Sequence, residues 1–234
     1  MSTTIYSCFV CLFFVAVGLF LIVRTTKVGE HSLLAKTLSS VLFVIIGALS
    51  LLSASYTLTK LMIVLGLVLG LVGDILLDLK VMNKESSSTY LNGGMLSFGA
   101  GHILYFVAVM TFLQDKVITG YGWVVLASFA FSMLIGALIV RFAPMLKMDF
   151  SGFKFQNWLY SSLLIFMTII TICLAIVLPI AWILAFGFVL FLASDLILST
   201  QYFGGKQDSK VLTVFNHVLY YLAQLLIASF AIFI

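Results

Sequence analysis

The chain has 234 residues, of which 63% are hydrophobic and 9% are charged, and its formal net charge is +4. Soluble domains carry roughly 25% charged residues, so this composition excludes a soluble protein and indicates an integral membrane protein. The near absence of alternating apolar and polar residues excludes an outer-membrane barrel, whose strands alternate with a period of two. Helices remain, because a helix satisfies its backbone hydrogen bonds internally within lipid.

Apolar stretches of about twenty residues match a hydrocarbon core roughly 30 Å thick. Eight occur in the chain, and Pro179 divides the sixth from the seventh, where the apolar run is too long for one crossing. The sequence therefore predicts an all-α membrane protein that forms one helical domain over residues 1–234. Its transmembrane helices are expected at about 5–23, 34–53, 60–79, 92–113, 121–140, 157–178, 180–199 and 211–234.

The positions of Lys and Arg predict the orientation, because cytoplasmic loops collect these residues. With both termini on the non-cytoplasmic side, only Lys60 and Lys116 fall on that side. The first span has no basic segment before it, so we expect an uncleaved anchor and not a signal peptide. The cytoplasmic ends then hold Arg24, Lys27, Lys36, Lys80, Lys84, Arg141, Lys147, Lys154, Lys206 and Lys210.

This orientation accounts for the positive net charge through the anionic inner leaflet, so no nucleic-acid partner is expected. The same rule holds in a bacterial inner membrane and in the endoplasmic reticulum membrane. The choice between these two membranes therefore stays open.

The third span ends with two acidic residues. Asp74 is expected about 9 Å from the cytoplasmic end of the span, at 1.5 Å per residue. A carboxylate in the hydrocarbon core costs about 2.5–3.5 kcal/mol and usually faces a cavity or a partner. Gly66, Gly70, Asp74 and Asp78 follow one another at i, i+4 spacing, which predicts a stripe that faces another helix. Asp78 is expected at the headgroup level, as an interfacial residue near the following lysines.

A similar arrangement occurs four spans later. Asp195 lies at the equivalent depth of the seventh span, and each acid-bearing span is followed by a helix with the pattern His-x-Leu-Tyr, at His102–Tyr105 and His217–Tyr220. This similarity predicts a parallel repeat of four plus four helices. Asp74 and Asp195 are the two acids expected to be buried within spans.

The helices that follow these acids carry polar groups on single faces, at positions typical of interhelical hydrogen bonds. Small residues at the start of the fourth helix favour close packing there. Together these patterns predict a polar cavity open toward the cytoplasmic leaflet. The polar faces hold His102 and Tyr105 on the fourth helix, and His217, Tyr220, Tyr221 and Gln224 on the eighth, while Asn92, Gly93, Gly94, Ser97 and Gly101 make the fourth helix narrow.

Motifs of the common hydrolases, nucleotide-binding loops and zinc sites are absent from the sequence. Neither a metal ion nor a cofactor is therefore expected.

Several short stretches, in order along most of the chain from the second span to the last, resemble the YhhN or lysoplasmalogenase family of eight-span membrane proteins. Two features depart from the family pattern: Thr37 follows Lys36 where proline is common, and His217 lies outside the pattern, so its role stays open. The stretches are Lys36, Gly-Leu-Val-Gly-Asp74, Phe98-x-x-Gly-His102-x-x-Tyr105, Ser194-Asp195 and Tyr220-Tyr221-x-Ala223-Gln224.

The resemblance implies hydrolysis of the vinyl ether bond of lysoplasmalogens, which gives a fatty aldehyde and a glycerophospho-ethanolamine or -choline. This reaction needs a neutral acid that protonates a carbon atom and an anion nearby, as two buried carboxyl groups provide. Asp74 and Asp195 are expected to be this pair, and which of them donates the proton stays open. The expected water-orienting or supporting residues are His102, Tyr105, Tyr220, Tyr221 and Gln224, and those expected near the substrate phosphate or headgroup are Lys36, Asp78 and Asn92.

Two other functions fit two four-helix halves with intramembrane acids: a proton-coupled transporter, and a lipid-binding protein without catalysis. A transporter is less favoured because the acids lie near one face of the membrane and not at its midplane. The expected partners are a lysophospholipid substrate and the bilayer, while headgroup preference and assembly into a homo-oligomer stay open.

Overall fold

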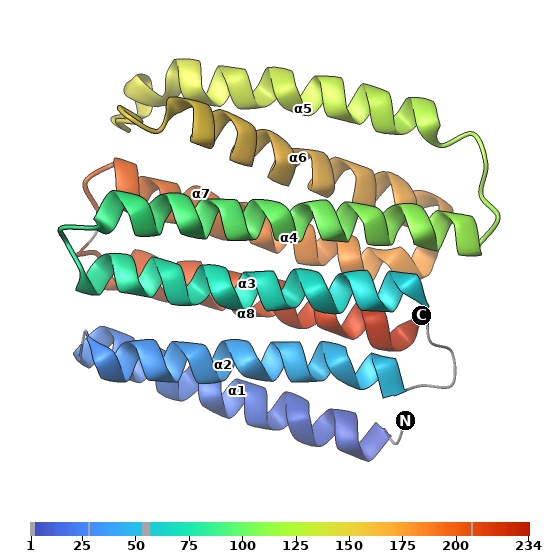
Figure 1. Ribbon diagram of the computed structural model, residues 1–234, viewed down its shortest axis with the longest axis horizontal. Helices are drawn as coiled ribbons and strands as arrows, with labels where there is room; N and C mark the ends of the chain where they lie inside the picture. Colours follow the sequence, from blue (N-terminus) through green and yellow to red (C-terminus); the bar gives the residue numbers. More distant parts are fainter. Residues whose placement is uncertain (1–2, 28, 53–56, 207) are drawn as a thin grey trace. The chain divides into compact units, whose positions relative to one another are not determined.

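The computed structural model describes residues 3–27, 29–52, 57–206 and 208–234, and all regular secondary structure in this part of the chain is helical (Figure 1). The long helices are α1 (Thr3–Thr26), α2 (Glu30–Ala48), α3 (Leu58–Met82), α4 (Ser87–Asp115), α5 (Gly122–Phe142), α6 (Lys154–Val177), α7 (Trp182–Phe203) and α8 (Lys210–Phe233). Short 3-10 helices follow three of them, namely η1 (Leu49–Leu52), η2 (Ala143–Leu146) and η3 (Pro179–Ala181).

Within the described residues, eight helices are long and apolar enough to cross a membrane, which confirms the predicted all-α membrane protein. The predicted break at Pro179 is also confirmed, because α6 ends at Val177 and η3 begins at Pro179. The second helix starts four residues earlier than expected, at Glu30. It follows Gly29, whose φ of 133° suits glycine, and an acidic residue in the first turn interacts favourably with the helix dipole.

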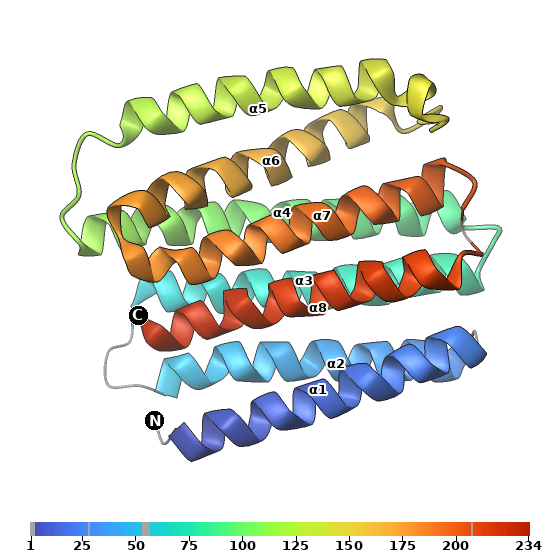
Figure 2. The ribbon, with the colours of Figure 1, turned by 180° about the vertical axis from the view of Figure 1, so that it is seen from behind.

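The chain divides into two compact units. Unit 1 comprises Met1–Thr111 and Gln224–Ile234, and unit 2 comprises Phe112–Ala223. Helices α4 and α8 therefore contribute residues to both units. In unit 1 the start of α1 and the end of α8 lie at the same end (Figures 1 and 2). Which side of a membrane this end faces remains a prediction.

In unit 1, α2 lies between α1 and α3 (Figure 2), and α3 packs closely on α4. A Cβ added to Gly73 would lie 2.6 Å from Cε2 of Phe98, and one added to Gly66 would lie 2.4 Å from Cε1 of Tyr105. The hydroxyl of Ser97 on α4 donates to the carbonyl oxygen of Leu69 on α3 over 2.7 Å. The close packing predicted for the start of the fourth helix is therefore confirmed.

In unit 2, α6 packs against both α5 and α7. At Gly136 the α5–α6 contact leaves no room for a side chain, because an added Cβ would lie 2.0 Å from Oγ of Ser162. The Trp158 indole N–H donates across the same interface to the carbonyl oxygen of Met133 over 3.2 Å. These contacts fix α6, which carries a partner of Asp195.

Candidate functional site

Asp74 on α3 is buried, with 2% of its surface exposed, and its carboxylate faces α2. Oδ2 accepts a hydrogen bond of 2.6 Å from the Ser40 hydroxyl, and Oδ1 lies 3.3 Å from Nζ of Lys36. Lys36 and Ser40 are one turn apart and so share a face of α2. One face of α2 thus supplies both a cation and a hydroxyl to this carboxylate.

Asp78, one turn further along α3, is equally buried, also with 2% exposed. Its Oδ1 lies 3.3 Å from Nζ of Lys36, and its Oδ2 lies 3.4 Å from Nη1 of Arg24 on α1. Asp78 is therefore buried beside cations of α1 and α2, and its expected depth at the headgroup level stays a prediction. Two cations from neighbouring helices accompany its charge.

We refer to Arg24, Lys36, Asp74 and Asp78 as the charge cluster. Its two positive and two negative groups sum to zero, which matters because an unpaired buried charge costs several kcal/mol. The Lys36 ammonium has three N–H donors and lies 3.3 Å from each of three oxygens: Asp74 Oδ1, the Asp74 carbonyl and Asp78 Oδ1. Lys36 is 5% exposed and its ammonium contacts the carboxylates of Asp74 and Asp78. A substrate phosphate, its predicted partner, therefore competes with these two carboxylates for Lys36.

The predicted stripe on α3 is buried, but it faces more than one helix. Each step of four residues advances the side chain by about 40°, because a helix has 3.6 residues per turn. Gly66 therefore contacts Tyr105 on α4, whereas Asp74 and Asp78 have turned toward α2 and α1. This rotation brings the acids to the cations.

On α4 the two predicted residues lie together and buried. His102 is 1% exposed and Tyr105 is 3% exposed, and their rings meet edge to face with centroids 6.0 Å apart. Nδ1 of His102 lies 2.7 Å from the carbonyl oxygen of Phe98, so it is the nitrogen that carries hydrogen for this bond. Asn92 is half-buried at the start of α4, and Gln224 on α8 is buried.

In unit 2, Asp195 on α7 accepts a hydrogen bond from the Tyr160 hydroxyl on α6. Asp195 is half-buried, so the expectation that it and Asp74 are the two buried acids needs correction. The fully buried acids within the described spans are Asp74 and Asp78. The Asn216 side-chain amide on α8 donates to the carbonyl and hydroxyl oxygens of Ser194, next to Asp195, over 2.8 and 3.1 Å.

The predicted polar face of α8 is buried over His217, Tyr220 and Tyr221. His217 uses Nδ1 as His102 does, at 2.7 Å from the carbonyl oxygen of Thr213 four residues earlier. The rings of Tyr220 and Tyr221 have centroids 5.2 Å apart. The structure thus brings these residues onto one packed face in unit 2.

The surroundings of the two acids correspond in sequence spacing. The hydroxyl that bonds each acid comes from the preceding long helix, 34 residues before Asp74 and 35 residues before Asp195. Because Asp74 belongs to unit 1 and Asp195 to unit 2, their pairing, like the repeat, stays a prediction.

Sequence reasoning missed four residues of these clusters: Arg24, Ser40, Tyr160 and Asn216. Arg24 was considered only among the Lys and Arg residues that predicted the orientation in the membrane. Ser40 had a signal, because it follows Lys36 by four residues and so shares its helical face. Tyr160 and Asn216 carry no local pattern that separates them from other polar residues in spans.

Comparison with known proteins adds one finding. A family model for the YhhN family matches residues 31–230. The chain belongs to the YhhN family. This family includes lysoplasmalogenases. No curated protein and no solved structure matches the chain. The matched segment contains both acids of the predicted pair and begins after Arg24. Among the described residues, no group of three His, Cys, Asp or Glu side chains is placed to hold a metal ion.

Proposed function

We propose that this YhhN-family protein is a lysoplasmalogenase, an ether hydrolase that converts a lysoplasmalogen and water into a fatty aldehyde and a glycerophospho-headgroup. The observation that carries the proposal is the buried Asp74 carboxylate, which Lys36 and Ser40 hold within the segment matched by the family model. A half-buried second acid, Asp195, belongs to the same segment.

The reaction begins when an acid donates a proton to the outer carbon of the vinyl ether, which leaves an oxocarbenium ion. The Lys36 ammonium lies 3.3 Å from Asp74 and stabilises the ionised form of this acid. We therefore assign Asp74 the anionic role beside the oxocarbenium ion. The proton donor is then Asp195, with its position held by Tyr160. This division of roles is the one that paired carboxyl groups have in glycosidases.

A water molecule next attacks the cationic carbon, and its proton returns to the donor acid. The resulting hemiacetal collapses to the aldehyde and releases the glycerol hydroxyl, so atoms and charge balance. His102 supports this step in the proposal, because Nδ1–H is used by its own helix and the neutral ring offers Nε2 as an acceptor toward water. Tyr105, Tyr220, Tyr221 and Gln224 complete the proposed supporting set.

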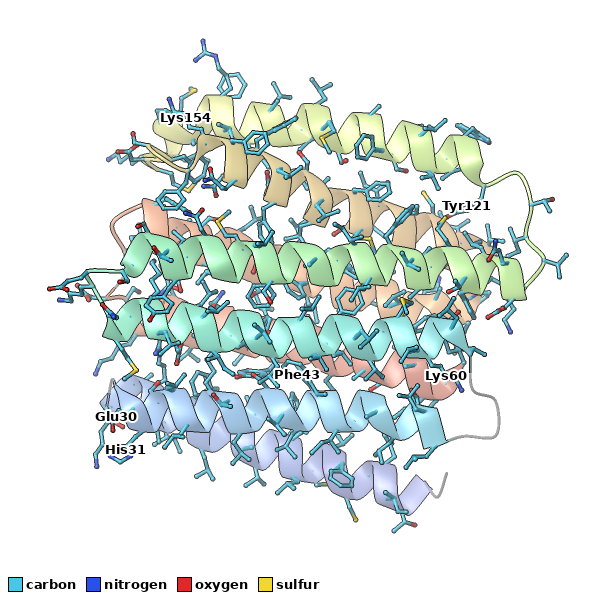
Figure 3. The ribbon with its side chains drawn as sticks, in the orientation of Figure 1. Glu30, His31, Phe43, Lys60, Tyr121 and Lys154 are labelled. Atoms are coloured by element: carbon cyan, nitrogen blue, oxygen red, sulfur yellow. The ribbon has the colours of Figure 1, made fainter. Side chains whose placement is uncertain are left out.

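Glu30 and His31 lie at the end of unit 1 where α2 begins, and Lys60 lies near the opposite end (Figure 3). Arg24 lies two residues before the end of α1 and Lys36 six residues after the start of α2, so the charge cluster lies toward the Glu30 end. Lysine and arginine collect on the cytoplasmic side of membrane proteins, and they are frequent at the Glu30 end. We therefore propose that the site serves lipids of the cytoplasmic leaflet. The vinyl ether of such a lipid lies just beneath its headgroup, at the depth of Asp74.

The test is aldehyde release by the purified protein from lysoplasmenyl-ethanolamine and lysoplasmenyl-choline, with the ester lysolipids for comparison. The wild type should release aldehyde from the vinyl ethers. Asp74→Asn and Asp195→Asn should each lower kcat at least about 100-fold, since acid–base groups contribute roughly 10²–10⁴-fold.

The matched control is Asp208→Asn, which makes the same substitution at an exposed acid in the connection between α7 and α8. It should leave the rate unchanged. Fatty-acid release from ester lysolipids without aldehyde would reject the substrate class. Full activity of Asp74→Asn in folded protein would reject the assigned site.

A further inference from the structure

Arg24 is the member of the charge cluster nearest the end of its helix, two residues before α1 ends at Thr26. Its side chain is 14% exposed, whereas that of Asp78 beside it is 3% exposed. The Arg24 side chain thus borders both the buried Asp78 carboxylate and the outside of the cluster. None of the roles assigned above uses it.

The Arg24 guanidinium is held by hydrogen bonds from one of its nitrogens, Nη1. Its Nη1 donates to the Ser32 hydroxyl over 3.2 Å and to Asp78 Oδ2 over 3.4 Å. Among the described residues these are its hydrogen-bond partners, and both use Nη1. Arginine has five N–H donors in a rigid fork, so the three on Nε and Nη2 remain for a ligand.

Three free donors in a planar fork suit a phosphate, which arginine binds through two parallel hydrogen bonds. The anchoring by Ser32 and Asp78 lowers the conformational entropy lost on binding, because the fork is already held in place. The negative charge of Asp78 is balanced by Lys36 as well as by Arg24, so an incoming anion does not meet a net negative cluster.

The spacing along α3 also fits one ligand that reaches from Arg24 to Asp74. Asp78, which contacts Arg24, is one turn from Asp74, about 6 Å along the helix axis. In a lysoplasmalogen the glycerol unit separates the phosphate from the vinyl ether by a similar length. Lys36 is less suited to the phosphate, because its ammonium lies within 3.3 Å of three oxygens of α3.

We propose that Arg24 binds the phosphodiester of the lysophospholipid substrate and so sets the preference for phospholipids over neutral ether lipids. This inference rests on the proposed function and assigns a substrate contact to a residue outside the segment that the family model matches.

The experiment compares two vinyl ethers, lysoplasmenyl-ethanolamine and 1-alkenylglycerol, which lacks the phosphate. The measured quantity is the ratio of their kcat/KM values for wild type, Arg24→Gln and Arg24→Lys. Arg24→Gln should lower this ratio about tenfold or more, mainly through KM, as expected for loss of a charge-assisted hydrogen bond. Arg24→Lys keeps the charge but loses the fork and should lower the ratio by a smaller factor.

The matched control is Lys27→Gln, which removes a positive charge from an exposed residue three positions later and should leave the ratio unchanged. An equal loss toward both substrates in Arg24→Gln would show that Arg24 acts only through Asp78 and would overturn the proposal. If Arg24→Gln does not fold, an unchanged ratio in Arg24→Lys overturns it.

A binding measurement separates this inference from the proposed function. Detergent-solubilised protein is titrated with 1-acyl lysophosphatidylethanolamine, with a monoacylglycerol and with inorganic phosphate. The wild type should prefer the lysophospholipid, and Arg24→Gln should lose that preference, even if no aldehyde is ever released. Equal preference in both proteins, or inorganic phosphate that binds as tightly as the lysolipid, would overturn the assignment of Arg24 to a lipid phosphate.

Discussion

The surroundings of Asp74 in unit 1 and of Asp195 in unit 2 have the same plan but different chemistry. Each acid lies on the third long helix of its unit and accepts a hydrogen bond from a hydroxyl on the helix before it. The partners of Asp74 include a lysine, and a second ion pair continues outward through Asp78 to Arg24. Asp195 instead receives the phenol of Tyr160 and is half-buried.

The residue before each acid extends the comparison, because it connects to the following helix. Gly73 lets Phe98 of α4 approach the backbone, whereas Ser194 receives two hydrogen bonds from Asn216 of α8. Unit 1 therefore fixes its acid by charge and close packing, and unit 2 by hydrogen bonds from uncharged side chains. This difference agrees with the roles proposed above, an anion at Asp74 and a proton donor at Asp195.

Removal of the cation should have the largest effect on this comparison. Lys36→Met leaves two buried carboxylates with one cation, and breaking a buried ion pair typically costs about 3–5 kcal/mol. We expect a loss of that size in reversible unfolding in detergent micelles. Lys36→Met combined with Asp78→Asn restores charge balance and should recover part of the loss. A single variant as stable as wild type would contradict the importance of charge in unit 1.

Close packing beside Asp74 should come next. Gly73→Ala places a Cβ 2.6 Å from the Phe98 ring, and overpacking of this kind costs about 1–3 kcal/mol. Gly93→Ala is the control, since its Cβ would lie 3.4 Å from the flexible end of Leu76, and alanine favours a helix over glycine by up to about 1 kcal/mol. The same unfolding measurement should place the two variants on opposite sides of wild type. Equal stabilities would contradict the close α3–α4 contact.

Loss of the Tyr160–Asp195 hydrogen bond in unit 2 should lower the stability by a smaller amount. Tyr160→Phe removes the donor to Asp195, and with Asp195 protonated, as its proposed role requires, this bond contributes about 0.5–1.5 kcal/mol to stability. Tyr121→Phe is the matched control, because its hydroxyl donates to the carbonyl oxygen of Ile170 over 3.3 Å. Both should lose similar stability, but only Tyr160→Phe should lower the rate of aldehyde release. A stability loss in Tyr160→Phe as large as that of Lys36→Met would remove the contrast between the units.

The smallest effect is expected at Asp149, an acid outside the spans. It serves as a reference for Asp74 and Asp195. The Ser151 hydroxyl, at 2.5 Å, and then the Ser151 backbone N–H, at 2.8 Å, hold the pKa of Asp149 below its usual range. Ser151→Ala should raise the pKa of Asp149 toward its ordinary value, so its carboxyl takes up a proton at higher pH. The measurement is the carboxyl carbon shift by NMR during a pH titration.

Lys154→Gln should raise the same pKa by a smaller amount, because its charge contributes less than the two hydrogen bonds. A larger rise in Lys154→Gln than in Ser151→Ala would contradict this order. A folded-state pKa that is held low adds stability above the unfolded-state value, and this stability is lost as the pH falls through the folded-state value.

Much of the fold was predictable because lipid imposes a simple rule on helix length and composition. The apolar runs located the eight helices, and the missing N–H of Pro179 located the break between α6 and α7. The spacing of Gly66 and Asp74 also showed that α3 presents these residues to protein. The pattern did not predict which helix each residue faces, because i, i+4 steps drift around the helix by about 40° each.

The charge cluster was predictable only in part. Lys36 and Asp74 were both expected near the site, and they form an ion pair. The burial of Asp78 depends on Arg24, 54 residues earlier on another helix, and no periodicity within one helix encodes such a contact. Tyr160 was missed for a related reason, since its partner lies 35 residues away.

Each helix that follows an acid-bearing helix contains a histidine with one ring nitrogen in a hydrogen bond to that same helix. His102 and His217 both direct Nδ1 to a carbonyl oxygen one turn earlier on their own helix. This hydrogen bond fixes the tautomer, because Nδ1 carries the single N–H of the uncharged imidazole. The opposite nitrogen of such an uncharged ring is an acceptor, and in the function proposed above Nε2 of His102 accepts an O–H of the attacking water, which leaves a lone pair of that water for the oxocarbenium carbon.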